Sequence, residues 1–145
     1  MRHAMILAGG AGTRLWPMSR ARRSKQLIPF IGGKSLLDLT YARLDGLFPI
    51  ERRYVCAAEW QRDVTLAGLP GLAGERFIGE PVGRDTVNAV GLCAAVIARD
   101  DPDAVIAVFT GDHVILPVDA FQRTLARGLS LVEQAPETAV RRTTR

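Results

Sequence analysis

Short apolar runs alternate with segments of helical periodicity along most of this chain. The apolar runs have the length of strands and occupy residues 4–8, 53–58, 76–80 and 104–110. Segments with a helical spacing of apolar residues occupy 36–48, 59–68, 85–99 and 120–134. Because this alternation is typical of βα units, we predict an α/β protein with a Rossmann-like, three-layer α/β/α fold and a mainly parallel sheet.

The residue spacing also predicts how these elements pack. The run AVIAVFT at 104–110 is continuous and rich in β-branched residues, which indicates a buried strand. The segment 36–48 is expected to be a helix capped by Ser35 that ends before Pro49. The helix 85–99 is expected to place Val90, Ala94 and Ile97 on one face.

The chain has the length and composition of one globular domain. Its 145 residues are 48% hydrophobic and 23% charged, values near the average for folded proteins. The last helix should cover the sheet with Phe121, Leu125, Leu129 and Val132. After Pro136 the periodicity stops, so we expect one apparently truncated domain over residues 1–138 and a disordered basic tail over 139–145.

A membrane or secreted location is disfavoured. The longest uncharged run, residues 86–98, is shorter than the roughly 18 apolar residues that a membrane span requires. The first ten residues match a secretory signal poorly, so we expect a cytoplasmic protein without a membrane partner. Cys56 and Cys93 have no metal-binding or redox spacing and lie in apolar surroundings, which predicts two small buried side chains.

The positive charge is concentrated in one place. The formal net charge is +4, and three of the arginines lie within the last five residues. Most of the remaining excess comes from a cluster formed by Arg14, Arg20, Arg22, Arg23 and Lys25. A short cluster with few aromatic neighbours favours a compact polyanion over nucleic acid as the partner.

A glycine-rich loop, GGAGTR, directly follows the first predicted strand and precedes this cluster. Parallel sheets bind ligands beyond the carboxyl ends of their strands, and closely spaced glycines let backbone N–H groups approach a phosphate. The dinucleotide motif GxGxxG fails because Leu15 stands at its last glycine, and the P-loop motif lacks its lysine. A glycine turn without a ligand remains the alternative.

Three segments carry a family resemblance. LAGGAGTRLWPMSRARRSKQLIPF, at residues 7–30, resembles the GGxGTRLxP motif of sugar nucleotidyltransferases and is most similar to mannose-1-phosphate guanylyltransferases. GEPVGRDTVNAVGLCAAV, at 79–96, resembles the family's second motif, and FTGDHVI, at 109–115, its metal-site motif. The resemblance covers about residues 4–138, which would be the nucleotide-binding half of the family's catalytic domain.

The resemblance implies a reaction. Sugar nucleotidyltransferases join a nucleoside triphosphate to a sugar 1-phosphate and release pyrophosphate. In the most similar branch the substrates are GTP and mannose 1-phosphate, the product is GDP-mannose, and the cofactor is Mg²⁺. Homodimers are common in the family and are an assembly to test. Catalysis of this kind depends on aligning two anions and neutralising their charge.

The resemblance also assigns roles to residues of this chain. Arg14 would hold the leaving pyrophosphate, Lys25 would lie near the reacting phosphates, and Asp112 would bind Mg²⁺. His113 is interpreted as a structural side chain. The remaining nucleotide-binding residues are Leu7 and Ala8 against the base, Gly9, Gly10, Gly12 and Thr13 around the triphosphate, and Glu80, Pro81 and Gly83 near the base.

Some residues depart from the family's pattern. Ser24 replaces a proline before Lys25, and Asp85 replaces an asparagine. In the family, the sugar-contacting residues and a second metal-binding aspartate belong to the other half of the domain, so the resemblance assigns none of them to residues 1–145. Two alternatives therefore stay open: a nucleotide-binding module without catalysis, and an enzyme that uses dTTP or UTP with glucose 1-phosphate.

Overall fold

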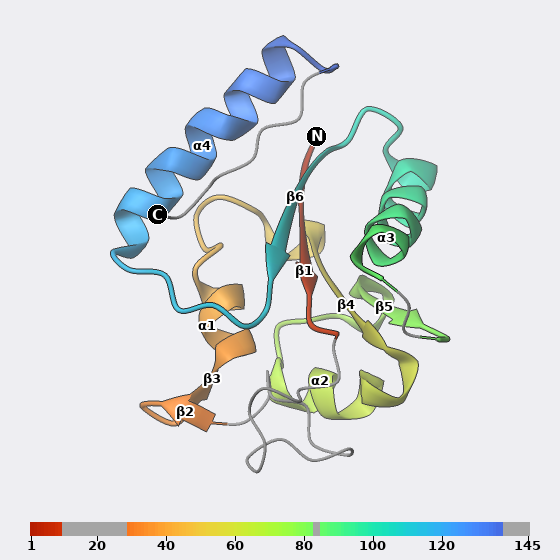
Figure 1. Cartoon of the computed structure of the whole chain (residues 1–145), viewed down its shortest axis with the longest axis vertical. Helices are drawn as coiled ribbons and strands as arrows, with labels where there is room; N and C mark the ends of the chain where they lie inside the picture. Colours follow the sequence, from red (N-terminus) through yellow and green to blue (C-terminus); the bar gives the residue numbers. More distant parts are fainter. Residues whose placement is uncertain (10–28, 83–84, 138–145) are drawn as a thin grey trace.

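A four-stranded parallel sheet forms the centre of the molecule (Figure 1). The computed structural model describes residues 1–9, 29–82 and 85–137. Within them the strand order is β5-β4-β1-β6. The strands are β1 (Arg2–Leu7), β4 (Arg53–Ala58), β5 (Phe77–Glu80) and β6 (Val105–Thr110). The predicted parallel sheet is confirmed, and all four predicted strands are present.

Helices cover both faces of this sheet (Figure 1). Ala4 and Ile6 of β1 belong to a core cluster with α1 (Leu36–Ala42) and α4 (Val118–Gln134). Met5, which points to the opposite face, belongs to a second cluster with α3 (Thr86–Asp100). This alternation along one strand produces the predicted α/β/α layers. The final helix covers the sheet as expected, with Phe121 and Leu129 buried.

The first helix is shorter than predicted. Ser35 caps α1 as expected: its hydroxyl oxygen accepts from the Asp38 N–H, while the Ser35 N–H donates to the Asp38 carboxylate at 2.8 Å. The helix ends at Ala42 instead of residue 48. Gly46 adopts a φ of 78° in the turns that follow, a conformation outside the helical region. Arg53 stabilises these turns by donating to the carbonyl oxygens of Tyr41 and Phe48.

The buried face of α3 is rotated from the predicted one. Ala89, Cys93 and Ile97 are buried at spacings of four residues, whereas the prediction was Val90, Ala94 and Ile97. Ala89, Cys93 and Ile97 belong to the second core cluster, and Val90 is only partly buried against it. Both stripes have helical spacing, so the choice between them depends on how closely the helix approaches the sheet.

The strand β6 is less buried than its composition predicted. Of its residues only Ala107 is buried, and Val108 is 44% exposed. The reason is its position, because β6 is the last strand in the sheet order of the described residues and pairs there only with β1. A continuous β-branched run therefore indicated a strand correctly but overstated its burial.

The connections contain shorter elements. β2 (Pro29–Ile31) and β3 (Lys34–Ser35) form an antiparallel hairpin that was not predicted, joined by Gly32 and Gly33 at φ values of 57° and 75°. The predicted helix 59–68 is divided into η4 (Glu59–Gln61) and α2 (Arg62–Gly68). The short helices η3 (Ile50–Arg52) and η5 (Gly74–Arg76) precede β4 and β5.

No helix in the described ranges is long and apolar enough to cross a membrane.

Candidate functional site

The parallel strands end together at one edge of the sheet, and the predicted site residues follow three of them. Gly9 lies shortly after β1, Glu80 and Pro81 lie at and beyond the end of β5, and Asp112 lies beyond the end of β6. The register pairs Leu7 with both Cys56 and Thr110, so the ends of β1, β4 and β6 are aligned. This is the edge at which ligands bind to parallel sheets.

Backbone hydrogen bonds continue past the end of β1. The Ala8 N–H donates to the Cys56 carbonyl at 2.8 Å, and the Gly111 N–H donates to the Leu7 carbonyl at 2.9 Å. A Cβ atom at Gly111 would lie 3.3 Å from the Leu7 carbonyl oxygen and 3.4 Å from Leu37 Cδ1. The close approach of the two strand ends therefore favours a glycine immediately before Asp112.

Glu80 reaches the beginning of the glycine-rich loop. A Cβ atom built on Gly9 would lie 3.3 Å from Glu80 Oε2, so the carboxylate is close to the backbone at Gly9. Gly9 is exposed and Glu80 is half-buried, whereas Ala8 is only 3% exposed and packs in the first core cluster. A ligand at this edge would meet the Glu80 carboxylate and the backbone of Gly9 together.

Asp112 lies in a short polar segment after β6. Its side chain is 32% exposed, and its Oδ1 lies 3.8 Å from His113 Nε2. The other ring nitrogen of His113, Nδ1, is hydrogen-bonded to Thr110 Oγ1 at 2.7 Å. The His113 carbonyl accepts from Arg43 Nη1 at 3.0 Å. Contacts of Gly111 and His113 thus hold the backbone on both sides of Asp112.

Two charged residues near this edge were missed by the sequence analysis. Glu59 directly follows β4, and Arg62 donates to its carboxylate from Nε at 2.5 Å and Nη2 at 2.9 Å. These bonds lower the pKa of Glu59. Arg43 is 5% exposed, and burial lowers the pKa of its guanidinium. A charged residue inside an apolar segment, YARLDGLF, was the signal that could have identified Arg43.

The donor atoms fit a hard cation that is held jointly with a ligand. In the described ranges no three His, Cys, Asp or Glu side chains come together as a metal-binding cluster. Mg²⁺ is commonly bound by one or two carboxylates, substrate phosphates and waters. The carboxylate of Asp112, partly exposed at the ligand-binding edge, fits that pattern.

The two cysteines are buried beside the site, as predicted. Cys56 is 1% exposed and Cys93 is fully buried, and both thiols are free. The hydrogen bond between these side chains, together with burial and the charge of Glu80, raises the pKa of Cys93. Both therefore serve as small core side chains beneath the edge of the sheet.

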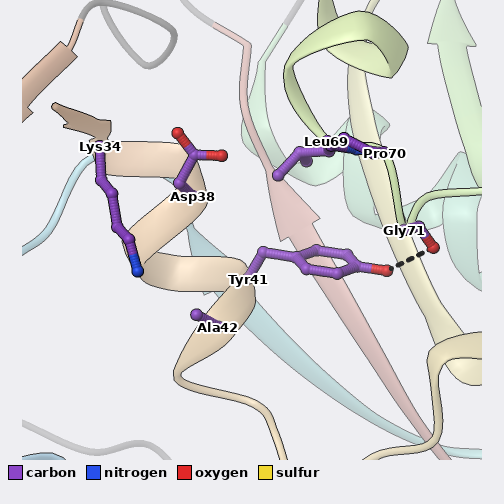
Figure 2. Close-up of a pocket in the computed structure, with 7 residues that line it drawn as sticks. All are labelled: Lys34, Asp38, Tyr41, Ala42, Leu69, Pro70 and Gly71. Carbon is purple, nitrogen blue, oxygen red and sulfur yellow. Dashed lines mark hydrogen bonds between the residues drawn. The ribbon is translucent and has the colours of Figure 1, made fainter.

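A separate cavity lies between α1 and the segment that follows α2 (Figure 2). Its volume is about 370 Å³. The Tyr41 side chain extends from α1, and its hydroxyl donates to the Gly71 carbonyl at 3.3 Å. The lining residues are Lys34, Asp38, Tyr41, Ala42, Leu69, Pro70 and Gly71. None of the predicted site residues is among them, and the Asp38 carboxylate already caps α1.

The structure thus brings together part of the predicted site. Leu7, Ala8, Gly9, Glu80 and Asp112 converge at one edge, and Pro81 is exposed beside them. The other predicted residues lie outside the described ranges: Gly10, Gly12, Thr13, Arg14, Lys25 and Gly83.

Comparison with known protein families assigns the chain. The family model described as nucleotidyl transferase matches residues 3–140. The chain belongs to the nucleotidyl transferase family. The Rossmann-like sheet and the convergence at its carboxyl edge are therefore features of a nucleotidyl transferase domain.

Relatives of this chain include larger bacterial proteins. It is 34% identical over 135 residues to the mannose-1-phosphate guanylyltransferase of Escherichia coli and 33% identical over 138 residues to the xanthan biosynthesis protein XanB of Xanthomonas campestris. Each alignment covers 90% of this chain and 28% of the relative. The chain therefore spans less than a third of the length of these relatives.

A solved structure gives the same fold. The crystal structure of mannose-1-phosphate geranyltransferase from Thermus thermophilus matches with a TM-score of 0.82 and 36% sequence identity. The match covers 92% of this chain and 38% of that protein.

Proposed function

We propose that this chain is the nucleotide-binding portion of an enzyme that joins GTP and mannose 1-phosphate to give GDP-mannose and pyrophosphate. The observation that carries the proposal is the similarity to a mannose-1-phosphate guanylyltransferase over 90% of the chain. The convergence of Gly9, Glu80 and Asp112 at the ligand-binding edge of the sheet supports it.

In the proposed reaction a phosphate oxygen of mannose 1-phosphate attacks the α-phosphorus of GTP. A new P–O bond forms there as the bond to the β-phosphate oxygen breaks, and pyrophosphate leaves with that electron pair. Gly9, Gly10, Gly12 and Thr13 would bind the triphosphate through N–H and hydroxyl donors. Arg14 would hold the leaving pyrophosphate, and Lys25 would bind the reacting phosphates.

Glu80 is proposed to select the base. Its carboxylate lies beside Gly9, and a carboxylate can accept from the N1–H and the amino group of guanine. In the binding site for the base, Leu7 and Ala8 would form the wall next to Glu80, and Pro81 and Gly83 would form the outer margin. Adenine lacks both of these donors, so the proposal predicts discrimination against ATP.

Asp112 is proposed to hold Mg²⁺ together with the nucleotide phosphates, since a single carboxylate with phosphates is a common arrangement for this ion. Mg²⁺ would neutralise the charge that develops on the phosphates. The chain's own contribution is to place the Asp112 carboxylate through the contacts of Gly111 and His113.

We also propose a cytoplasmic, homodimeric protein, and light scattering of the purified chain tests the dimer.

Calorimetry on the 145-residue chain tests the nucleotide. GTP with Mg²⁺ should bind more tightly than ATP, UTP or dTTP. Arg14→Ala should weaken GTP binding about tenfold or more, because a charge-assisted contact to phosphate is lost. Arg22→Ala, in the same basic cluster, is the matched control and should change affinity little. A preference for dTTP or UTP would favour the alternative enzyme, and GTP binding that is unchanged in Arg14→Ala would contradict the phosphate site.

Turnover requires a second experiment. The chain alone should release little pyrophosphate from GTP and mannose 1-phosphate, because it spans 28% of the relative. A chimera of residues 1–138 with the remainder of the E. coli enzyme should be active and should lose activity with Arg14→Ala. A folded chimera that binds GTP without turnover would favour a non-catalytic module.

A further inference from the structure

Arg43 is a buried cation at the junction of three segments. It follows α1, is 5% exposed, and forms none of the ion pairs among the described residues. Its Nε atom is buried without a hydrogen-bond partner in the same part of the chain. Burial of a charge with an unpartnered nitrogen is unfavourable, so an arginine at this position calls for a role beyond filling space.

The contacts of Arg43 connect the first and last helices to the segment after β6. Nη2 donates to Thr40 Oγ1 at 3.1 Å, and the guanidinium lies 5.1 Å from the ring centre of Phe121 on α4. Gln122 Nε2 donates to the Arg43 carbonyl at 3.1 Å. From this position Nη1 donates to the His113 carbonyl at 3.0 Å.

The carbonyl that accepts from Arg43 belongs to His113, the residue next in sequence after Asp112. On the other side of Asp112, the Gly111 N–H donates to the Leu7 carbonyl at 2.9 Å. A hydrogen bond therefore holds the backbone on each side of Asp112: one joins Gly111 to the Leu7 carbonyl of β1, and the other joins the His113 carbonyl to the buried side chain of Arg43. Replacing Arg43 would remove the second of these hydrogen bonds and let the Asp112 carboxylate move relative to the carboxyl edge of the sheet.

We propose that Arg43 is a positioning residue that orients Asp112 for a metal-bound nucleotide, an inference that rests on the proposed function. Arg43 acts through the backbone of His113 and does not touch the ligand. Residues that orient a metal ligand from outside its coordination sphere typically contribute tenfold to a hundredfold to metal affinity. Its effect should therefore appear in the metal-dependent part of nucleotide binding.

Arg53 provides a matched control. It is 4% exposed, and its guanidinium lies 5.2 Å from the ring centre of Tyr41. It donates to the Phe48 carbonyl at 2.9 Å and to Asp45 Oδ1 at 2.7 Å. Arg53 thus resembles Arg43 in burial and in binding backbone carbonyls, but it stabilises the turns after α1 and not the segment of Asp112.

The experiment compares Arg43→Met, Arg43→Lys and Arg53→Met in the 145-residue chain. Calorimetry measures GTP affinity with Mg²⁺ and with EDTA. Arg43→Met should weaken binding of GTP with Mg²⁺ about tenfold and change metal-free binding less than about twofold. Arg43→Lys, which keeps one donor and the charge, should recover part of the loss. Arg53→Met should lower the unfolding temperature and leave both affinities unchanged.

A spectroscopic measurement complements the affinities. Mn²⁺ added with GTP should broaden the backbone amide signals of Asp112 and its neighbours in a ¹⁵N-labelled chain. This broadening should be lost in Arg43→Met and kept in Arg53→Met. If Arg43→Met does not fold, Arg43→Lys carries the same comparison.

The outcomes separate the two proposals. Failure of the unsubstituted chain to bind GTP would overturn the proposed function and this inference with it. GTP binding by that chain, with equal losses in Arg43→Met in Mg²⁺ and in EDTA, would overturn the positioning role alone. If Arg53→Met also weakened GTP binding in Mg²⁺ but not in EDTA, the positioning role of Arg43 would again be overturned, because general destabilisation would then explain the loss of affinity.

Discussion

The two ends of the same sheet are held by different interactions. At the amino-terminal end, side chains pair with one another: Arg2 binds Glu133 at 2.6 Å, and His3 and the chain's amino group contact Asp101 at 2.8 and 3.1 Å. At the carboxyl-terminal end, the connections described above run through backbone groups of Leu7, Gly111 and His113.

This difference shows how one fold separates stability from binding. At the amino-terminal end, charged groups satisfy each other and fasten α4 and the residues after α3 to β1. At the carboxyl-terminal end Glu59 is paired with Arg62, but the contacts beside Asp112 run through the backbone of Leu7, Gly111 and His113. The carboxylates of Glu80 and Asp112 remain partly exposed to solvent. Similar residue types thus stabilise the fold at one end and supply a candidate ligand-binding surface at the other.

The largest expected effect is on stability, from Arg53→Met at the beginning of β4. The change removes both Arg53 hydrogen bonds to the buried Phe48 carbonyl, one of the two donors to the Tyr41 carbonyl, and the ion pair with Asp45. We expect the free energy of unfolding to fall by about 3 kcal/mol. GTP affinity should not change. Urea denaturation and calorimetry measure the two quantities. A parallel loss of GTP affinity would mean that the two ends of the sheet are not independent.

Asp112→Asn tests the opposite end. Without the carboxylate, binding of GTP with Mg²⁺ should weaken about tenfold, or about 1.4 kcal/mol, while binding in EDTA should be nearly unchanged. The free energy of unfolding should change by less than about 0.5 kcal/mol. Asp119→Asn, at an exposed ion pair on α4, is the control. Equal binding with and without Mg²⁺ in the unsubstituted chain would contradict the metal role.

Gly111→Ala tests the close contact between β6 and β1. The added Cβ would lie 3.3 Å from the Leu7 carbonyl oxygen, and the strand ends would have to shift. We expect a loss of about 1 kcal/mol of stability, with a small decrease in GTP affinity. Gly91→Ala on the exposed side of α3 meets nothing within 4 Å and should be neutral or stabilising. Thermal unfolding distinguishes the two substitutions.

The smallest effect concerns pH and the amino-terminal end. The hydrogen bond from His3, followed by the chain's amino group, lowers the pKa of Asp101 below its usual 3.8. A lowered pKa in the folded state stabilises the protein above the unfolded value, and this contribution disappears as the pH falls through the folded value. Asp101→Asn should therefore make the free energy of unfolding fall less steeply as the pH is lowered. Urea midpoints measured between about pH 2 and pH 6 would show it, and identical slopes would contradict the assignment.

The order of strands along the chain could be predicted from the sequence, because each strand is a contiguous apolar run. The bounds of β4 agree with the prediction, and those of β1, β5 and β6 differ by one or two residues. The β2–β3 hairpin was missed although Gly32 and Gly33 are a two-residue turn signal. Such a short hairpin has little apolar periodicity, so only its turn could have revealed it.

The candidate site could be predicted only in part. The positions of Gly9, Glu80 and Asp112 at or just after the ends of their strands followed from the pattern, and the structure brings them to one edge. The roles assigned to these residues, and to Arg14 and Lys25 outside the described ranges, remain predictions. Arg43 was not foreseen, because its contacts join residues 70 or more positions apart in the chain.

Local patterns thus determined the α/β class, the succession of strands and the location of the glycine-rich loop, since each depends on neighbouring residues. The tertiary structure decided which residues of α3 face the sheet, how far β6 is covered, and which arginine contacts the Asp112 segment. These features depend on the approach of elements that are distant in sequence. Spacing along one helix or strand does not determine how closely another will pack against it.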